Sequence, residues 1–344
     1  MFSTDAVRIA VPATSANLGP GFDSLGLALE LEDEVTACVT DGGFHIEVTG
    51  EGAGEVPSGR LGAGEEHLVL ATMFAAFDRI GLPRPPGLAL TCHNRIPHAR
   101  GLGSSSAAIV AGVVLARELV AEGGPVLDDA AALRLAAEIE GHPDNVAPCL
   151  LGGFTIAWTG PDGAHAVRLV PDPRVRPVVF IPTTRAATAA ARAALPATVP
   201  HVDAAFNAAR AALLVHALTT DPGLLLEATA DRLHQEYRSA AMPESADLVA
   251  RLRADGVPAV VSGAGPSVLA LLLTGEDAGE DAAEVARKTA GPTGADTTGG
   301  ASDQGVARPP EGWCARSLSV SLDGARILLS RHAEGDPVAA GPPS

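Results

Sequence analysis

The chain has 344 residues, of which 47% are hydrophobic and 19% are charged, and its formal net charge is −17. This length is typical of about two domains, and the composition provides ample apolar material for a folded core. The acidic balance excludes a general nucleic-acid-binding protein, because such proteins neutralise phosphates with clustered lysine and arginine side chains.

The four cysteines are scattered along the chain and form no C-x-x-C pair. This pattern indicates reduced thiols rather than a disulfide framework or a metal site. The N-terminal segment lacks a basic stretch followed by an apolar one, so we expect no signal peptide. The longest apolar runs, such as VLALLL at 268–273, are too short to cross a membrane. We therefore expect a cytoplasmic protein with no membrane partner.

The first half of the chain mixes predicted strands and helices. Strands are expected at 7–11, where Pro12 ends the strand, and at 34–39, 44–48 and 88–92. Helices are expected at 67–80, from residue 107 to the glycines at 123–124, and at 128–140. Asp128 is a candidate cap for the last of these helices and Gly141 a candidate stop.

The second half begins again with strands, followed by helices. Strands are expected at 154–158 and 176–181, then alanine-rich helices between 186 and 254, then paired strands at 257–262 and 268–273. Two strands around the turn dipeptide Asp323-Gly324 are expected within 315–329. Residues 275–312 contain few large apolar side chains and predict a mobile insertion, and the tail from residue 334 is expected to be disordered. Because the pattern lacks a steady strand–helix alternation, it favours an α+β architecture.

One glycine- and serine-rich stretch, PHARGLGSSSA at 97–107, lies between an expected strand and an expected helix. The first amide groups of a helix have no internal partner and carry partial positive charge, so such a loop can hold a phosphate. It is not a Walker A loop, because no G-K-[ST] sequence follows and Lys288 is the only lysine. Taken by itself, such a glycine-rich stretch is more often an ordinary turn before a helix.

Four motifs change this interpretation. The pattern P-x-x-x-G-L-G-S-S, from Pro97 to Ser105, resembles the phosphate loop of the GHMP kinases. The segments VPATSANLGPGFDSLGLAL (11–29) and EIEGHPDNVAPCLLGG (138–153) resemble two further motifs in the form found in the family's homoserine kinase branch. VSGAGPSVLAL (261–271) resembles the family's glycine-rich third motif, and all four motifs occur in the family's order. The resemblance covers residues 7–330 apart from the insertion. The family usually has alanine where Ser106 stands, a difference that we expect to be harmless.

The resemblance implies a two-domain α+β GHMP kinase fold. A ribosomal-protein-S5-like N-terminal domain would occupy residues 1–155, and a ferredoxin-like C-terminal domain would occupy 156–333, with the insertion at about 275–312 and the tail at 334–344. It also implies ATP and Mg²⁺ as cofactors. The residues expected to bind ATP are Pro97, His98, Ala99, Arg100, Gly101, Leu102, Gly103, Ser104, Ser105, Ser106 and Ala107.

The acids at the end of the helix 128–140 are candidate metal ligands. Two acids at a helix C-terminus are unfavourable against the dipole, although a solvated helix end would accommodate them. The resemblance implies that one of them binds Mg²⁺ together with Ser105. Aligning the family's glutamate favours Glu138, and Glu140 is the alternative.

Asn145 lies at the position where mevalonate-kinase-like relatives have an aspartate that serves as general base. His142, Asp144 and Asn145 could also be a loop turned by Pro143. The resemblance gives Asn145 a catalytic role beside Ser105 and Glu138. Because an amide cannot accept a proton, it implies that no side chain acts as general base.

The remaining candidates are substrate-binding residues. Asp23 lies at the edge of an apolar segment, where a carboxylate needs a partner such as an ammonium group. Arginines on amphipathic helices are usually only solvated, but the resemblance implies that Arg192 and Arg238 bind a carboxylate. Asn17 would assist Asp23, and Thr188 would lie near the substrate hydroxyl.

These assignments imply ATP-dependent phosphorylation of L-homoserine to O-phospho-L-homoserine, a step of threonine biosynthesis. Two alternatives are another GHMP kinase with a mevalonate-like substrate, and a nucleotide-sensing protein of the same fold that has lost catalysis. A homodimer is an open alternative to a monomer.

Overall fold

The computed structural model describes residues 2–3, 5–61, 67–120, 127–186, 188–274 and 310–329. Nearly all of the expected insertion at 275–312, and the whole tail at 334–344, lie outside these ranges. Within them, no helix is both long and apolar enough to span a membrane. All four cysteines are free, as the sequence predicts.

The larger of the two sheets formed by the described residues has eight strands. The order along its main path is β12-β1-β2-β5-β3-β4, and β6 and β7 extend it from β2. All neighbouring strands are antiparallel except β3 and β5, which are parallel. The strands are β1 (Val7–Ala16), β2 (Leu25–Thr40), β3 (Gly43–Gly50), β4 (Gly59–Leu61), β5 (Gly87–Asn94), β6 (Phe154–Gly160), β7 (Gly163–Leu169) and β12 (Arg326–Leu329).

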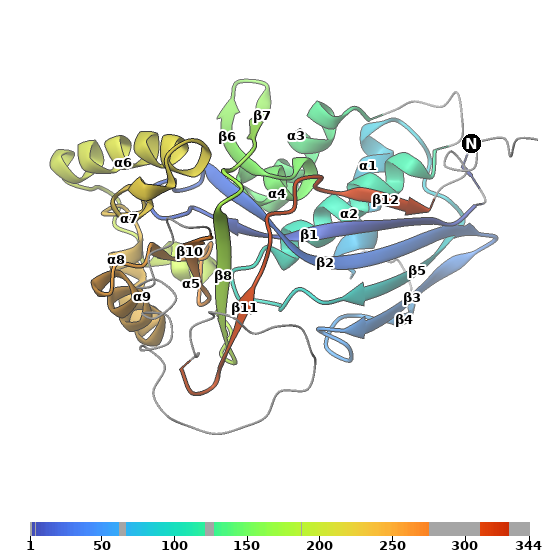
Figure 1. Cartoon of the computed structure of the whole chain (residues 1–344). Coiled ribbons are helices and arrows are strands. Elements are labelled where there is room, and N and C mark those ends of the chain that lie inside the picture. The colour runs from blue at the N-terminus through green and yellow to red at the C-terminus, as the bar shows by residue number, and fades with distance from the viewer. Residues whose placement is uncertain are drawn as a thin grey trace, which may run out of the picture.

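Four helices pack against this sheet (Figure 1). They are α1 (Leu68–Arg79), α2 (Ser104–Glu118), α3 (Asp129–Glu140) and α4 (Pro143–Leu151). Helices α2 and α4 both contact β1, and α3 packs on α2 and α4. The start of α2 and the end of α3 are thereby held close to the end of β1.

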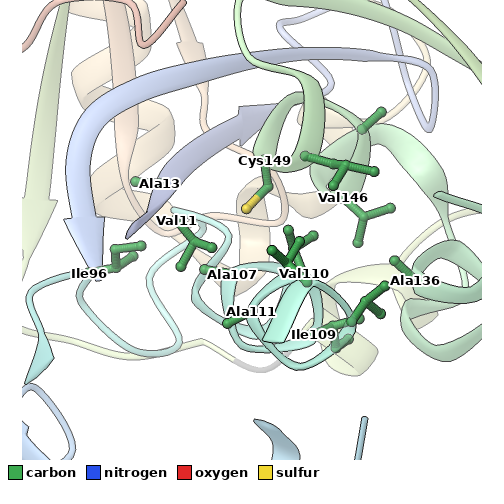
Figure 2. Close-up of a cluster of buried hydrophobic side chains, with 14 of the residues drawn as sticks. Val11, Ala13, Ile96, Ala107, Ile109, Val110, Ala111, Ala136, Val146 and Cys149 are labelled. Carbon is green, nitrogen blue, oxygen red and sulfur yellow. The ribbon is translucent and has the colours of Figure 1, made fainter. Parts of the chain in front are cut away.

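Small apolar side chains allow these elements to approach closely. Figure 2 shows Ala107, Val110 and Ala111 of α2 near Val11 of β1, with Cys149 of α4 close by. All five are almost fully buried. Because each fully buried valine contributes about 1.5–3 kcal/mol, this cluster gives the helix start that follows the glycine-rich loop a rigid support.

A smaller sheet has four antiparallel strands in the order β11-β8-β10-β9. They are β8 (Val175–Pro182), β9 (Ala259–Val261), β10 (Val268–Leu273) and β11 (Trp313–Ser317). The remaining helices lie around it, at the opposite end of the molecule from α1 (Figure 1). They are α5 (Thr188–Ala193), α6 (His201–Thr219), η1 (Pro222–Leu224), α7 (Leu225–Ala228), α8 (Gln235–Arg238), η2 (Ser239–Ala241) and α9 (Pro243–Ala254).

Several predicted elements are confirmed. The helices at 67–80 and 128–140 and the paired strands at 257–262 and 268–273 are present as α1, α3 and the β9–β10 pair. Asp128 caps α3 by accepting a hydrogen bond from the amide of Ala131 at 2.7 Å. Gly141 ends the helix with a φ of 91°, a conformation that glycine adopts without strain.

Other boundaries differ from the prediction because of proline and of long-range pairing. Strand β1 continues through Pro12, with a shift of register between Pro12 and Ala13, so a bulge accommodates the missing amide. Pro143 begins helix α4 rather than a loop, since proline is well suited to the first helical turn. The two strands predicted around Asp323-Gly324 are present as β11 (Trp313–Ser317) and β12, but they do not pair with each other as a hairpin. β11 pairs with β8 in the small sheet, and β12 pairs with β1 in the large one.

Candidate active site

The stretch at 97–107 forms a loop that ends in the first turn of α2. Gly103 lies just before the helix with a φ of 71°, and a Cβ on it would come within 2.0 Å of Thr14 Oγ1. A Cβ on Gly101 would come within 2.2 Å of the carbonyl oxygen of Ser262. Only glycine therefore allows this loop to pass between the end of β1 and the loop after β9.

Arg100 fixes the loop to the end of β8. Its Nε donates to the carbonyl oxygen of Pro182 at 2.9 Å, and its two terminal nitrogens donate to the carbonyls of His98 and Thr183. The amide of Ala186 also donates to the carbonyl of Ala99 at 3.0 Å. Because this guanidinium binds three carbonyl oxygens, its main contribution is to hold the loop in place.

Two serines of the first helical turn bind one carboxylate. Ser105 Oγ donates to Glu140 Oε2 at 2.9 Å, and Ser106 Oγ donates to Glu140 Oε1 at 2.7 Å. Glu138 instead accepts a hydrogen bond from Arg79 at 2.6 Å, with 66% of its side chain exposed. Residues two apart on a helix point to nearly opposite sides, so only one of these acids can face the serines. The expectation that favoured Glu138 beside Ser105 is therefore corrected to Glu140.

Asn145 lies in α4 with its amide orientation fixed by Thr14. Thr14 is fully buried, and its Oγ1 donates to Asn145 Oδ1 at 2.8 Å. Since the amide oxygen receives this hydrogen bond, the amide nitrogen is the group left to face the pocket. Asn145 can therefore donate hydrogen bonds there but cannot accept a proton.

Asn17 and Asp23 belong to the turn between β1 and β2. Asn17 Nδ2 donates to the carbonyl oxygen of Gly263 at 2.8 Å, and Asn17 Oδ1 accepts from the amide of Asp23 at 3.0 Å. Both residues have positive φ, 67° and 54°. Arg192, at the end of α5, donates to both carboxylate oxygens of Asp23, each at 2.8 Å.

Arg238 lies nearby but is buried, with 3% of the residue exposed. Its Nε donates to the carbonyl oxygen of Ala191 at 3.1 Å, and its Nη1 lies 3.2 Å from His234 Nδ1. His234 Nε2 in turn donates to the carbonyl oxygen of Gly19 at 2.7 Å. Burial lowers the pKa of His234, which favours the neutral ring that this pair of hydrogen bonds requires. These contacts join the arginine to the turn that carries Asn17 and Asp23.

These groups line one pocket, with a cavity volume of about 100 Å³. The glycine-rich loop and Glu140 lie along it together with Asn145, Arg192 and Arg238. His142 and Asp144 also line it, and His142 Nδ1 donates to Asp144 Oδ1 at 2.6 Å. The pocket therefore combines helix-terminal amides, hydroxyls, carboxylates and guanidinium groups.

A second, larger pocket of about 290 Å³ shares Ala99, Ser104 and Ser105 with the first. Its walls are mostly apolar, from residues such as Val11, Val35, Val56, Leu68 and Val69. His67 lines it with 4% of the residue exposed, and its Nδ1 is buried without a hydrogen-bond partner among the described residues. Burial also lowers the pKa of His67, so the ring is neutral near pH 7.

Comparison with known proteins decides the family. Residues 67–153 match the family model described as GHMP kinases N terminal domain, and residues 209–290 match that described as GHMP kinases C terminal. A homoserine kinase of Streptomyces avermitilis is 54% identical over 328 residues, which cover 95% of this chain and 97% of the relative. A homoserine kinase of Streptomyces coelicolor is 60% identical over 270 residues, which cover 78% of this chain and 85% of the relative.

The chain belongs to the homoserine kinase branch of the GHMP kinase family.

Solved structures agree with this assignment. The crystal structure of homoserine kinase from Cytophaga hutchinsonii has a TM-score of 0.75 at 25% identity, with 95% of this chain and 99% of that one covered. A putative homoserine kinase from Listeria monocytogenes has a TM-score of 0.68 at 29% identity, with 94% and 99% covered. The predicted α+β GHMP kinase fold is thus confirmed.

Most of the site residues expected of a GHMP kinase lie together. The first pocket is lined by Asn17, Asp23, Ala99, Arg100, Gly101, Leu102, Gly103, Ser104, Ser105, Asn145, Arg192 and Arg238. His98 and Ala107 line the second pocket, while Pro97 is buried beside the loop and lines neither. Thr188 begins α5, but its side chain lies outside the described part of the structure.

The sequence predictions gave no site role to four polar residues that line the two pockets: His142, Asp144, His67 and Asp33. Asp33 could have been found, because it lies on the buried side of β2. Leu31, Val35 and Ala37 lie on the same side. An acid in such an apolar series needs a specific partner. Asp33 has two, the amides of Arg95 and Ile96, at 2.6 and 2.8 Å.

Proposed function

We infer that this protein transfers the γ-phosphate of ATP to the side-chain hydroxyl of L-homoserine, forming O-phospho-L-homoserine for threonine biosynthesis. The observation that carries this inference is a single pocket that joins the glycine-rich loop to the opposite charges of Asp23 and Arg192. The curated relatives at 54% and 60% identity are named homoserine kinases, which supports the same reaction.

ATP is proposed to bind across both pockets. Its phosphates would meet the amide groups at the start of α2, where a helix N-terminus favours anions. Its nucleoside would enter the second pocket, whose apolar walls suit a flat aromatic base and which is continuous with the loop through Ser104 and Ser105. The phosphate chain would then point from the second pocket toward the first.

Ser105 and Glu140 are proposed to hold Mg²⁺. They offer a hydroxyl and a carboxylate oxygen in mutual contact at the edge of the loop, and hard oxygen donors are what Mg²⁺ prefers. No group of three or more histidine, cysteine, aspartate or glutamate side chains forms a metal cage among the described residues. This suits a cation that takes most of its ligands from phosphates and water. Bound there, Mg²⁺ would neutralise charge on the transferred phosphoryl group.

The amino-acid part of the substrate would lie at the other end of the first pocket. Asp23, assisted by Asn17, is proposed to bind the ammonium group, and Arg192 and Arg238 the carboxylate. These three charged groups line the pocket together, which supports the assignment. Thr188, at the start of α5, is proposed to lie near the hydroxyl.

The chemistry would then depend mainly on positioning. Asn145 would donate hydrogen bonds from its amide nitrogen and orient the reacting groups, since Thr14 already occupies its oxygen. Phosphoryl transfer needs alignment and neutralisation of charge more than covalent help from the protein. The hydroxyl proton is proposed to leave to solvent or to the phosphate itself.

A coupled assay of ADP release with a panel of alcohols tests this function. Homoserine, mevalonate, galactose and 4-diphosphocytidyl-methylerythritol are compared at equal concentrations. We expect homoserine to give by far the highest kcat/KM. A preference for mevalonate would identify another GHMP kinase, and ATP binding without ADP release with any alcohol would identify a nucleotide-sensing protein.

A further inference from the structure

Ser106 is a buried serine in the first turn of α2. It is 0% exposed, and unlike Ser104 and Ser105 it lines neither pocket. It therefore cannot contact a phosphate or a metal ion directly. Its hydroxyl nevertheless makes one short hydrogen bond, donating to Glu140 Oε1 at 2.7 Å.

Glu140 is thereby held at both carboxylate oxygens. Ser105 binds Oε2 at 2.9 Å, and Ser106 binds Oε1. The last torsion of a glutamate side chain is broad, so a hydrogen bond to one oxygen leaves the carboxylate plane free to turn. Two hydrogen bonds from neighbouring residues of a rigid helix fix that plane.

The two serines have different surroundings. Ser105 is exposed and lines both pockets, so its hydroxyl is accessible to a cation or a phosphate. Ser106 is shielded from both and can keep its hydrogen bond to Oε1 whatever binds in the pockets. Its contact is thus suited to holding Glu140 in one orientation while Ser105 and Oε2 engage a ligand.

We propose that Ser106 is a positioning residue that orients the Glu140 carboxylate for the bound divalent cation. This role rests on the proposed function, in which Ser105 and Glu140 hold Mg²⁺. It also revises the expectation from the sequence that serine in place of the family's usual alanine at this position is harmless. The extra hydroxyl supplies a second hydrogen bond to the acid that the structure places beside the loop.

The test measures binding of a non-hydrolysable ATP analogue by calorimetry, with Mg²⁺ and in EDTA, without homoserine. Ser106→Ala should weaken binding of the Mg²⁺ complex by about 10-fold, because a hydrogen bond to a charged group is lost. Binding in EDTA should stay unchanged. Ser106→Cys, which keeps the size and a weak donor, should fall between the wild type and the alanine variant.

Ser245→Ala is a matched control. Ser245 is also a buried helical serine, 1% exposed, and donates at 2.6 Å to the carbonyl of Pro266, but it lines neither pocket. This variant should lower the melting temperature without changing the effect of Mg²⁺ on nucleotide binding. Thermal melting of all variants establishes that each is folded at the temperature of the binding assay.

A double-mutant cycle with Glu140→Gln tests the role of Ser106 separately from the assignment of Glu140 as a metal ligand. If Ser106 acts through Glu140, Ser106→Ala should add little to the loss in Glu140→Gln. If Ser106→Ala weakens nucleotide binding equally with and without Mg²⁺, or leaves binding unchanged in both conditions, the role of Ser106 is overturned. The metal assignment would remain intact. A wild-type response to Mg²⁺ in Glu140→Gln would instead overturn the metal assignment, and the role of Ser106 with it.

Discussion

Arg192 and Asp23 neutralise each other beside the first pocket, with each of two guanidinium nitrogens 2.8 Å from one carboxylate oxygen. The partners lie on the last turn of α5 and on the turn before β2, far apart in the sequence. A zwitterionic substrate can replace this pair by giving an ammonium group to Asp23 and a carboxylate to Arg192. A substrate with only one of these charges would leave one partner without its counter-ion.

Asp23→Asn should therefore discriminate between homoserine and 4-hydroxybutyrate, which has no amino group. For homoserine, loss of a hydrogen bond to a charged group should lower kcat/KM roughly 10- to 150-fold. For 4-hydroxybutyrate, kcat/KM should not fall, because that substrate brings no ammonium group and leaves the Asp23 carboxylate without a counter-ion in the wild type. Arg238→Ala, the comparison variant, should penalise both substrates, since both carry a carboxylate. An equal loss for both alcohols in Asp23→Asn would exclude Asp23 as the ammonium partner.

The two acids at the end of α3 should differ in their effect on the metal. Glu140→Gln should lower kcat at least 10-fold and raise the Mg²⁺ concentration needed for half-maximal rate, because Glu140 contacts Ser105. Glu138→Gln, its matched control, should keep nearly wild-type kinetics, since Glu138 is paired with Arg79 at the surface. A Mg²⁺ titration of initial rates checks both, and the reverse ranking would restore Glu138 as the ligand.

Asn145 provides a test for general-base catalysis. Asn145→Ala should lower kcat by less than the roughly 10²–10⁴-fold that the loss of a general base costs. Asn145→Asp should not accelerate the reaction, because a carboxylate there adds negative charge beside the phosphates. Steady-state kinetics of the two variants are sufficient. A rate increase of a hundredfold or more in Asn145→Asp would show that a missing base limits the wild-type enzyme.

His67 should contribute to recognition of the nucleobase. Its buried Nδ1 has no hydrogen-bond partner among the described residues, and a base in the second pocket could supply one. His67→Ala should raise the KM for ATP about 10-fold and reduce the preference for ATP over GTP. Affinity for inorganic tripolyphosphate, which has no base, should stay the same. His45→Ala, a change at an exposed histidine, serves as control.

Asp33 should make stability depend on pH. Burial raises its pKa from the ordinary 3.8 to about 6, so the folded state binds the proton more tightly than the unfolded state. That contribution to stability is complete below pH 3.8 and is lost as the pH rises through about 6. Relative to Asp33→Asn, the wild type should lose about 2 kcal/mol of free energy of unfolding between pH 4 and pH 7. Urea unfolding of both proteins across this range measures the difference, and parallel curves would contradict it.

Local sequence signals were sufficient for much of the fold and of the site. Helical periodicity and end signals identified α1 and α3, and the glycine–serine pattern identified the loop before α2. Motif resemblance brought Asn17, Asp23, Arg192 and Arg238 together, although they come from three separate segments. These features depend on short stretches whose chemistry is readable in the chain itself.

What the sequence could not provide depends on contacts between distant segments. The choice between Glu138 and Glu140 is decided by which side of α3 faces α2, and the burial of Asp33 by the packing of β2. The second pocket is formed by side chains from Val11 to Ala108, so no single motif marks it. The partners of β11 and β12 likewise depend on tertiary pairing rather than on the turn between them.

The pairing of β12 with β1 has a consequence for how the chain acquires its fold during synthesis. Residues 326–329 pair with residues 8–10, the two ends of the described sequence. Domains generally fold as units while the ribosome extends the chain, N-terminal part first. Here the large sheet lacks its edge strand until residues 326–329 have been translated. Nascent chains stalled before residue 326 should expose the unpaired edge of β1 and depend on chaperones more than released, full-length protein does.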